Sequence, residues 1–165
     1  MRVEYINPFV EAAFNVLRDV LNAMGGEVVD VKRGDLYLKS SNMSIMGVAA
    51  LVGLAGDVEG RVLFDMSKGT ALFVAGSMNG EEFVAIDDMV KATITELANM
   101  ITAQAVTKLH DLGFKFDLTP PALFTGENME ISNNLDVEAL IVPMELGLNG
   151  TKGTIEINVV IRERS

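Results

Sequence analysis

The stretch DDMVKATITELANMITAQAVTKLHDLG, residues 87–113, carries the longest helical pattern in the chain. Its apolar residues recur every three or four positions, which is the period of an α-helix. Two acids at its start suit the positive end of the helix dipole, and Gly113 is a typical stop signal. The pattern therefore predicts a helix that begins between Ala85 and Asp88, runs for roughly seven turns and ends near Leu112.

This segment has one apolar stripe, which predicts the face that packs on the core. Glu96 and Asn99 lie off the stripe, about one turn apart along the axis, so both side chains point outwards together. Their neighbours Ala92 and Ala103 are small, which would let another macromolecule approach the helix closely. An exposed acid and amide are usually just solvated groups, so the spacing alone is weak support for a function. The stripe consists of Val90, Ile94, Leu97, Ile101, Ala105, Leu109 and Leu112.

Further helices and strands are predicted on both sides of this helix. Asn7 and Pro8 are typical of a helix cap and first helical residue, and the periodic pattern that follows runs to Gly25. Ser67 is placed to cap a shorter helix that ends at Asn79-Gly80. Alternating or continuous apolar runs predict strands in segments 27–31, 36–40, 44–56, 59–66, 137–148 and 154–164, with a turn at Asn149-Gly150 between the last two.

The last strand alternates between apolar and polar residues, so we expect it to have one dry and one solvated side. Pro143 has no amide hydrogen to donate, which indicates an edge position or a bulge in its strand. The strands follow one another without regular helical crossovers. The sequence therefore predicts a single α+β domain over residues 1–165, a two-layer sandwich in which long helices pack on a mostly antiparallel sheet.

Composition restricts the possible functions. The chain has 165 residues, 49% of them hydrophobic, and a net charge of −10, which repels phosphate backbones and argues against nucleic acid as a partner. Without cysteine, the chain can have neither a disulfide nor a thiolate nucleophile. The N-terminus lacks the apolar region of a signal peptide, and the most apolar run, residues 45–55, is too short to span a bilayer. We expect a cytoplasmic protein without a membrane association.

The motif ELANM at 96–100, followed by HDLGFKFDLTPPALFTGENMEI at 110–131, resembles the chemotaxis phosphatases of the CheX and CheC type, and CheX most closely. The similarity extends to INPFVEAAFNVLRDVL at 6–21 and to GDVEGRVLF at 56–64. A Glu-x-x-Asn motif alone matches many helices. Its position before the Thr-Pro-Pro segment makes the combination more specific.

The resemblance implies hydrolysis of the aspartyl phosphate on a CheY-like response regulator. Asn99 would orient the attacking water, and Glu96 would pair with the lysine of the regulator's active site. Ala92, Met100 and Ala103 are the expected partner contacts around them. The resemblance also implies that Mg²⁺ is held by the regulator's own carboxylates, so that no cofactor or metal site is expected in this chain.

CheC-type members carry a second motif in the first helix. Here Glu11 is followed by Asn15, a spacing of four, so the resemblance implies one site per chain. It also implies a homodimer formed through sheet edges, and a long strand such as 154–162 would need such protection from open-ended pairing. The family often has Gly where this chain has Ala98, whose methyl group is expected to narrow the approach of a partner.

Other interpretations of the sequence stay open. The chain could be a non-catalytic CheC-like module that binds a regulator, another signalling protein or the flagellar switch, or an oligomerisation protein with no regulator partner. His110 and Asp111 are adjacent on a helix and do not face each other, so we expect an ordinary helix-end role for His110. The glycines between Gly53 and Gly56 lack the Lys of a phosphate-binding loop. Asn133-Asn134 is expected to be a loop.

Overall fold

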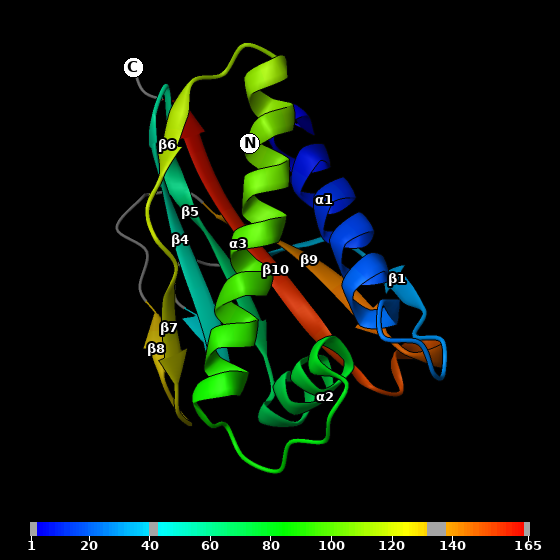
Figure 1. Ribbon diagram of the computed structural model, residues 1–165. Helices are drawn as coiled ribbons and strands as arrows, with labels where there is room; N and C mark the ends of the chain where they lie inside the picture. Colours follow the sequence, from blue (N-terminus) through cyan, green and yellow to red (C-terminus); the bar gives the residue numbers. More distant parts are fainter. Residues whose placement is uncertain (1–2, 40–42, 132–137, 164–165) are drawn as a thin grey trace.

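The computed structural model describes residues 3–39, 43–131 and 138–163. Within them, helices cover one face of a twisted sheet (Figure 1), and every strand pair is antiparallel, which confirms the α+β prediction. The helices are α1 Val3–Asn22, α2 Lys68–Asn79 and α3 Asp88–Asp111. The strands are β1 Val31–Arg33, β2 Tyr37–Lys39, β3 Met43–Ser44, β4 Val48–Gly56, β5 Val58–Met66, β6 Phe116–Leu118, β7 Ala122–Thr125, β8 Glu130–Ile131, β9 Ala139–Leu146 and β10 Gly153–Glu163, with a 3₁₀ turn η1 at Leu148–Gly150.

The main sheet has eight strands with β10 near its centre. The hydrogen-bonded order is β1-β9-β10-β5-β4-β6, while β2 also pairs with β9 and β7 also pairs with β4. Because β9 and β5 flank β10 on its two sides, the expectation that strand 154–162 needs protection as an open edge is wrong. The edges are formed instead by β1 and β2 on one side and by β6 and β7 on the other.

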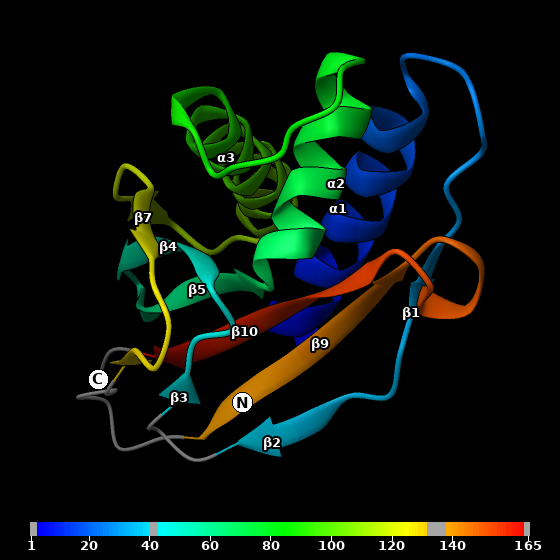
Figure 2. The same ribbon diagram turned by 90° about the horizontal axis from the view of Figure 1, so that it is seen from below.

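The core lies between this sheet and the three helices (Figure 2). The predicted stripe of α3 is buried from Val90 to Leu109, which confirms the orientation of the helix. Leu112 is the exception, because it lies just beyond the last helical residue and is 59% exposed. The apolar face of the sheet meets the helices along alternate residues of β10, as the alternation predicted: Ile155, Ile157, Val159 and Ile161.

The ends of α2 and α3 agree with their sequence signals. The Asp87 side chain accepts the Val90 N–H at 2.9 Å and caps α3. Ser67 caps α2 by accepting the Thr70 N–H at 3.1 Å, and Gly80 ends that helix in the left-handed conformation that glycine adopts without strain.

Helix α1 begins earlier than predicted, because Pro8 lies inside it rather than at its first position. A proline this close to the N-terminus removes one backbone hydrogen bond. Burial compensates for that loss, because Tyr5 and Ile6 are only 2% and 5% exposed. The Tyr5 ring packs edge-on against the Phe114 ring, with 4.9 Å between the ring centres. The tertiary contacts of the first turn therefore override the local cap signal.

Pro143 lies opposite a gap in the edge of the sheet, as its missing donor requires. β1 pairs with β9 from Leu146 to Met144, and β2 pairs with β9 from Ile141 to Ala139. In the interval between β1 and β2, the Gly34 N–H donates a hydrogen bond to the Pro143 carbonyl at 2.8 Å. No strand lies where an N–H group of residue 143 would have to donate. β9 is nevertheless an inner strand, with β10 on one side and β1 and β2 on the other, so the predicted edge position is wrong. The proline is tolerated because it faces the interval between the two outer strands.

The face of the sheet opposite the helices is less exposed to solvent than the alternation of apolar and polar residues in β10 predicted. Asn158 and Val160 lie on this face, yet they are only 1% and 0% exposed. The small sheet of β3 and β8 lies on the same side (Figure 2), next to a second apolar cluster. That cluster contains Ile45, Ala49 and Leu63, packed against Leu51, Phe124, Met129 and Ile131.

Acidic groups meet on this second face. Asp65 of β5 is directly opposite Glu156 of β10, and Asp65 accepts the Met46 N–H at 3.0 Å. Burial, supported by the charge of Glu156, raises the pKa of Asp65 from 3.8 to about 6. Burial and the hydrogen bond that the Tyr37 hydroxyl donates to Glu156 raise the pKa of Tyr37 to about 12.

We predict that Gly60→Ala destabilises the fold strongly. Gly60 has a φ of 156°, and a Cβ atom there would overlap the backbone carbonyl oxygen of Val160 on the paired strand. Relief requires β5 and β10 to separate, which we expect to cost on the order of 3 kcal/mol of unfolding free energy. Gly69→Ala is the control, because its Cβ would meet only the Ser67 hydroxyl at 3.9 Å on a helix. Urea unfolding of both variants measures the difference, and equal midpoints would contradict the argument.

We also predict that Asp65→Asn stabilises the protein at pH 8 and much less at pH 4. Folding raises the pKa of Asp65 from 3.8 to about 6, so the folded state favours the protonated carboxyl group. The contribution of Asp65 to the free energy of unfolding is therefore fully present below pH 3.8 and is lost as the pH rises through 6. An amide is neutral at every pH and can still accept the Met46 N–H. We expect a gain of about 1–2 kcal/mol at pH 8 by urea unfolding. A gain of the same size at pH 4 would show that the charge of Asp65 is not its cause.

Candidate functional site

Glu96 and Asn99 lie on the face of α3 that points away from the sheet. Both side chains are exposed, and so are Ala92 and Ala103 on the adjacent turns. Figure 1 shows α3 on the outer side of the molecule, beside α1, with its length open to an approaching partner. The structure therefore brings the predicted catalytic pair together on one accessible surface.

Neither Glu96 nor Asn99 is used by the fold. Within the described residues, neither side chain forms a hydrogen bond or an ion pair. A partner could therefore engage both groups without breaking an internal contact. Desolvation of these groups would cost free energy in such an encounter, and new hydrogen bonds to the partner would offset it.

The side chains on the turns adjacent to this pair include the small Ala92 and Ala103. The hydroxyls of nearby threonines are consumed within the helix, because Thr95 donates to the Lys91 carbonyl at 2.8 Å and Thr107 donates to the Ala103 carbonyl at 3.0 Å. Such back-bonding removes hydroxyls that would otherwise be solvated. The face thus presents two polar side chains above a smooth backbone.

The opposite side of the same turns anchors the helix. Leu97 and Ala98 are each 1% exposed and Ile101 is fully buried, so the motif is held by core packing. Ala98 points into the core, and its methyl group does not narrow the approach of a partner, contrary to our expectation. Met100 is half-buried and packs against the core, so only part of it is accessible at the predicted partner surface.

The other candidate residues have structural contacts. Glu11 forms an ion pair with Lys108, whose Nζ lies 2.6 Å from Oε2, and this pair joins α1 to α3. The Nε2 atom of His110 lies 3.2 Å from the carbonyl oxygen of Phe116, which fits the helix-end role that we predicted. The Thr119 hydroxyl accepts the Gly53 N–H at 2.7 Å and ties the Thr-Pro-Pro segment to β4. These contacts explain the residues without a catalytic role.

The pair by itself lacks the groups of a complete active site. The chain has no cysteine, and its one histidine packs against Phe116 at the end of α3. Among the described residues, no three His, Asp or Glu side chains group closely enough to hold a metal ion. An amide that can orient water and a carboxylate that can pair with a cation are what the surface offers.

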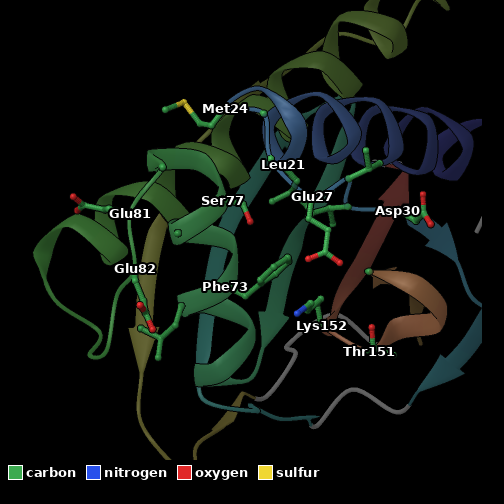
Figure 3. A pocket seen from close by; sticks show the side chains of 18 of the residues that line it. Leu21, Met24, Glu27, Asp30, Phe73, Ser77, Glu81, Glu82, Thr151 and Lys152 are labelled. Atoms are coloured by element: carbon green, nitrogen blue, oxygen red, sulfur yellow. The ribbon is translucent and has the colours of Figure 1, made fainter.

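Two hollows in the described part of the structure lie away from this pair. A groove of about 740 Å³ is formed at the end of α1, along α2 and at η1 (Figure 3), and another of about 400 Å³ lies near the start of α3. Neither is lined by Glu96 or Asn99. Because the motif stands on a convex helix, it suits a macromolecule with its own pocket better than a small molecule. Sequence reasoning missed the larger groove, since its walls come from distant segments.

The described helices include none that is long and apolar enough to cross a lipid bilayer.

Comparison with known proteins identifies related phosphatases. The family model described as "Chemotaxis phosphatase CheX" matches residues 48–145, a range that contains α3 and the strands beside it. The CheY-P phosphatase CheX of Thermotoga maritima is 28% identical over 134 residues, which cover 81% of this chain and 83% of that protein.

Solved structures share the same fold over nearly the whole chain. The CheX-CheY-BeF3-Mg²⁺ complex from Borrelia burgdorferi matches at 48% identity with a TM-score of 0.82, covering 98% of this chain and 100% of that chain. A CheC-like superfamily protein from Shewanella sp. PV-4 matches at 29% identity with a TM-score of 0.85, covering 98% of this chain and 99% of that chain.

Proposed function

Because the chain belongs to the chemotaxis phosphatase CheX family, we propose that it hydrolyses the aspartyl phosphate of a CheY-like response regulator in the cytoplasm. Two relatives support this substrate. The similar protein of Thermotoga maritima is named a CheY-P phosphatase, and the Borrelia burgdorferi relative forms a crystalline complex with CheY. The catalytic residues in this proposal are Glu96 and Asn99.

Asn99 acts on the attacking water. Its carboxamide can accept one hydrogen bond and donate another, so it can hold a water molecule in line with the bond between phosphorus and the aspartyl oxygen. An acyl phosphate is already reactive, and positioning the nucleophile supplies much of the remaining catalysis. Helix α3 delivers this side chain into the regulator's pocket, since Ala92 and Ala103 leave room for a close approach.

Glu96 acts on the regulator. Its carboxylate pairs with the lysine of the regulator's active site and fixes how deeply α3 enters the pocket. Magnesium, held by the regulator's own carboxylates, supplies charge neutralisation at the phosphoryl oxygens. This division of labour fits the chemistry of the exposed surface, where a water-orienting amide and one acid are present without a nucleophile.

The observation that carries the proposal is the exposure of Glu96 and Asn99 on a helix whose other side is fixed in the core. Electrostatic steering does not help, because the chain has a net charge of −10 and response regulators present an acidic pocket. Recognition must then depend on shape and on the contact between Glu96 and lysine. A modest affinity for the regulator follows.

We predict that Asn99→Ala and Glu96→Ala abolish turnover while the fold survives. The measurement is phosphate release from a phosphorylated CheY-like protein at sub-stoichiometric amounts of this chain. We expect kcat to fall about 100-fold or more for Asn99→Ala, because the water loses its orienting group. Unfolding free energies should stay within about 0.5 kcal/mol of the wild type, since both side chains are exposed.

Gln104→Ala is the matched control, because Gln104 is an exposed amide on the same helix that is not part of the motif. It should retain wild-type turnover. Equal rates for the wild type and Asn99→Ala would reject the role of Asn99. Binding of the regulator without any turnover by the wild type would favour the alternative, a non-catalytic CheC-like module for a regulator or for the flagellar switch.

We further infer a homodimer formed through the edge strand β2. Leu36, just before β2, and Tyr37 and Leu38 within it are 38%, 40% and 60% exposed, which is unusual for consecutive large hydrophobic residues at a sheet edge. Pairing of β2 with its copy would cover these side chains and satisfy backbone groups at the edge. The opposite edge carries no comparable run among its described residues.

Leu38→Lys is predicted to weaken this dimer, because a lysine on an edge strand opposes strand pairing. We expect the dissociation constant from light scattering to rise at least about ten-fold. Val84→Lys replaces another exposed apolar residue, 89% accessible and away from the edge, and should leave the mass unchanged. A wild type that is monomeric at high concentration would refute the inference.

A further inference from the structure

The groove beside α2 has the features of a second binding surface. Three parts of the chain meet there: the end of α1 with the loop that follows it, one face of α2 with the loop that follows it, and the turn between β9 and β10 (Figure 3). Its volume of about 740 Å³ is large enough to hold several side chains of a partner. The residues that line it include none from α3, so its occupant could bind while Glu96 and Asn99 are engaged.

The floor of the groove is apolar. Leu72, Phe73 and Phe83 are half-buried and pack against the core, so they form a firm floor. Along the rim, three large apolar side chains are mostly open to solvent, with exposed fractions of 60% for Met24, 74% for Val28 and 69% for Leu148. Such clustering of exposed apolar groups around one hollow is typical of a protein-binding surface.

Carboxylates surround this apolar surface. Glu27, Asp30, Glu81 and Glu82 all line the groove and are exposed, while Lys152 is its only cation. None of the four acids has an ion-pair partner among the described residues. The groove is therefore strongly negative and would attract a cationic partner.

Lys152 shows how a cation is accommodated there. Its Nζ atom lies 5.9 Å from the centre of the Phe73 ring, within range of a weak cation–π contact. Figure 3 shows both side chains at the groove, with the carboxylate of Glu27 nearby. The chain thus places its own ammonium group where the negative rim and an aromatic face meet.

We propose that this groove binds a basic segment of a partner protein, one that carries a large apolar anchor between lysine or arginine residues. The apolar floor binds the anchor side chain, and the four carboxylates pair with the flanking lysine or arginine side chains. The four carboxylates of the groove disfavour an acidic segment of a second copy of this chain, and they disfavour nucleic acid as well. Lys152 carries the same charge as the basic segment, so it weakens the binding of that segment to the groove.

The experiment uses the full chain and a short fluorescent peptide with tryptophan and leucine one helical turn apart between lysines and arginines. Fluorescence anisotropy measures its binding. We expect Glu81→Gln with Glu82→Gln to lower the affinity about ten-fold at low salt, and Leu148→Ser with Val28→Ser to lower it as well. Lys152→Gln should change it in the opposite direction and raise the affinity, because a like charge is removed.

A matched control separates the groove from the general acidity of the chain. Asp117→Asn with Glu130→Gln removes two exposed acids that lie away from the groove, and should leave peptide binding unchanged. A peptide in which glutamates replace the lysines and arginines should not bind. The groove variants should keep the phosphatase rate of the wild type, or, if the wild type shows no turnover, its binding of a beryllofluoride-treated regulator.

Several results would overturn the proposal. If removing the groove acids and removing the remote acids lowered the affinity for the peptide equally, its binding would be non-specific charge attraction. Displacement of the peptide by spermidine alone would mean that apolar anchoring is not required. Displacement by the beryllofluoride-treated regulator would assign the groove to the regulator and not to a separate partner.

Discussion

Burial of one apolar stripe of α3 against the sheet orients every other side chain on that helix. Because Leu97 and Ile101 are held in the core, Glu96 and Asn99 must face solvent from the same turns. A helix also holds its side chains more rigidly than a loop does. The packing of α3 therefore holds the two groups on one face before any partner arrives. In the proposed reaction this would lower the entropic cost of positioning a water molecule.

An exposed pair of this kind is useful because the remaining parts of the reaction can come from the substrate. A response regulator brings its own phosphoryl group, lysine and metal-binding carboxylates, so its phosphatase need add only an amide and a carboxylate. Such a site would need no cavity of its own, and neither of the two hollows described above is lined by Glu96 or Asn99. Pocket geometry alone would direct attention to the groove beside α2 and not to the face of α3.

The two surfaces of the molecule differ in what they can recognise. The face of α3 around Glu96 and Asn99 has small neighbouring side chains, and under the proposed function it would recognise a regulator by a close fit. The groove beside α2 combines an apolar floor with four exposed carboxylates and is suited to a basic partner. Since different elements form them, a phosphatase could be held in place through one surface while it acts through the other.

The amino-acid sequence by itself determined the features that depend on neighbouring residues. The limits of α2 and α3, the outward position of Glu96 and Asn99 and the buried stripe beneath them follow from helical periodicity and from the Ser67 and Asp87 caps. Periodicity predicted these features because residues three or four apart share one helical face.

Only the tertiary structure decided the features that depend on distant pairing. It put β10 near the centre of the sheet, buried Asn158 on the face opposite the helices and started α1 at Val3, before Pro8. It also assembled the acidic groove from separate segments. Strand order and surface assembly arise from contacts between residues far apart in the chain, and no local pattern encodes which of these contacts form.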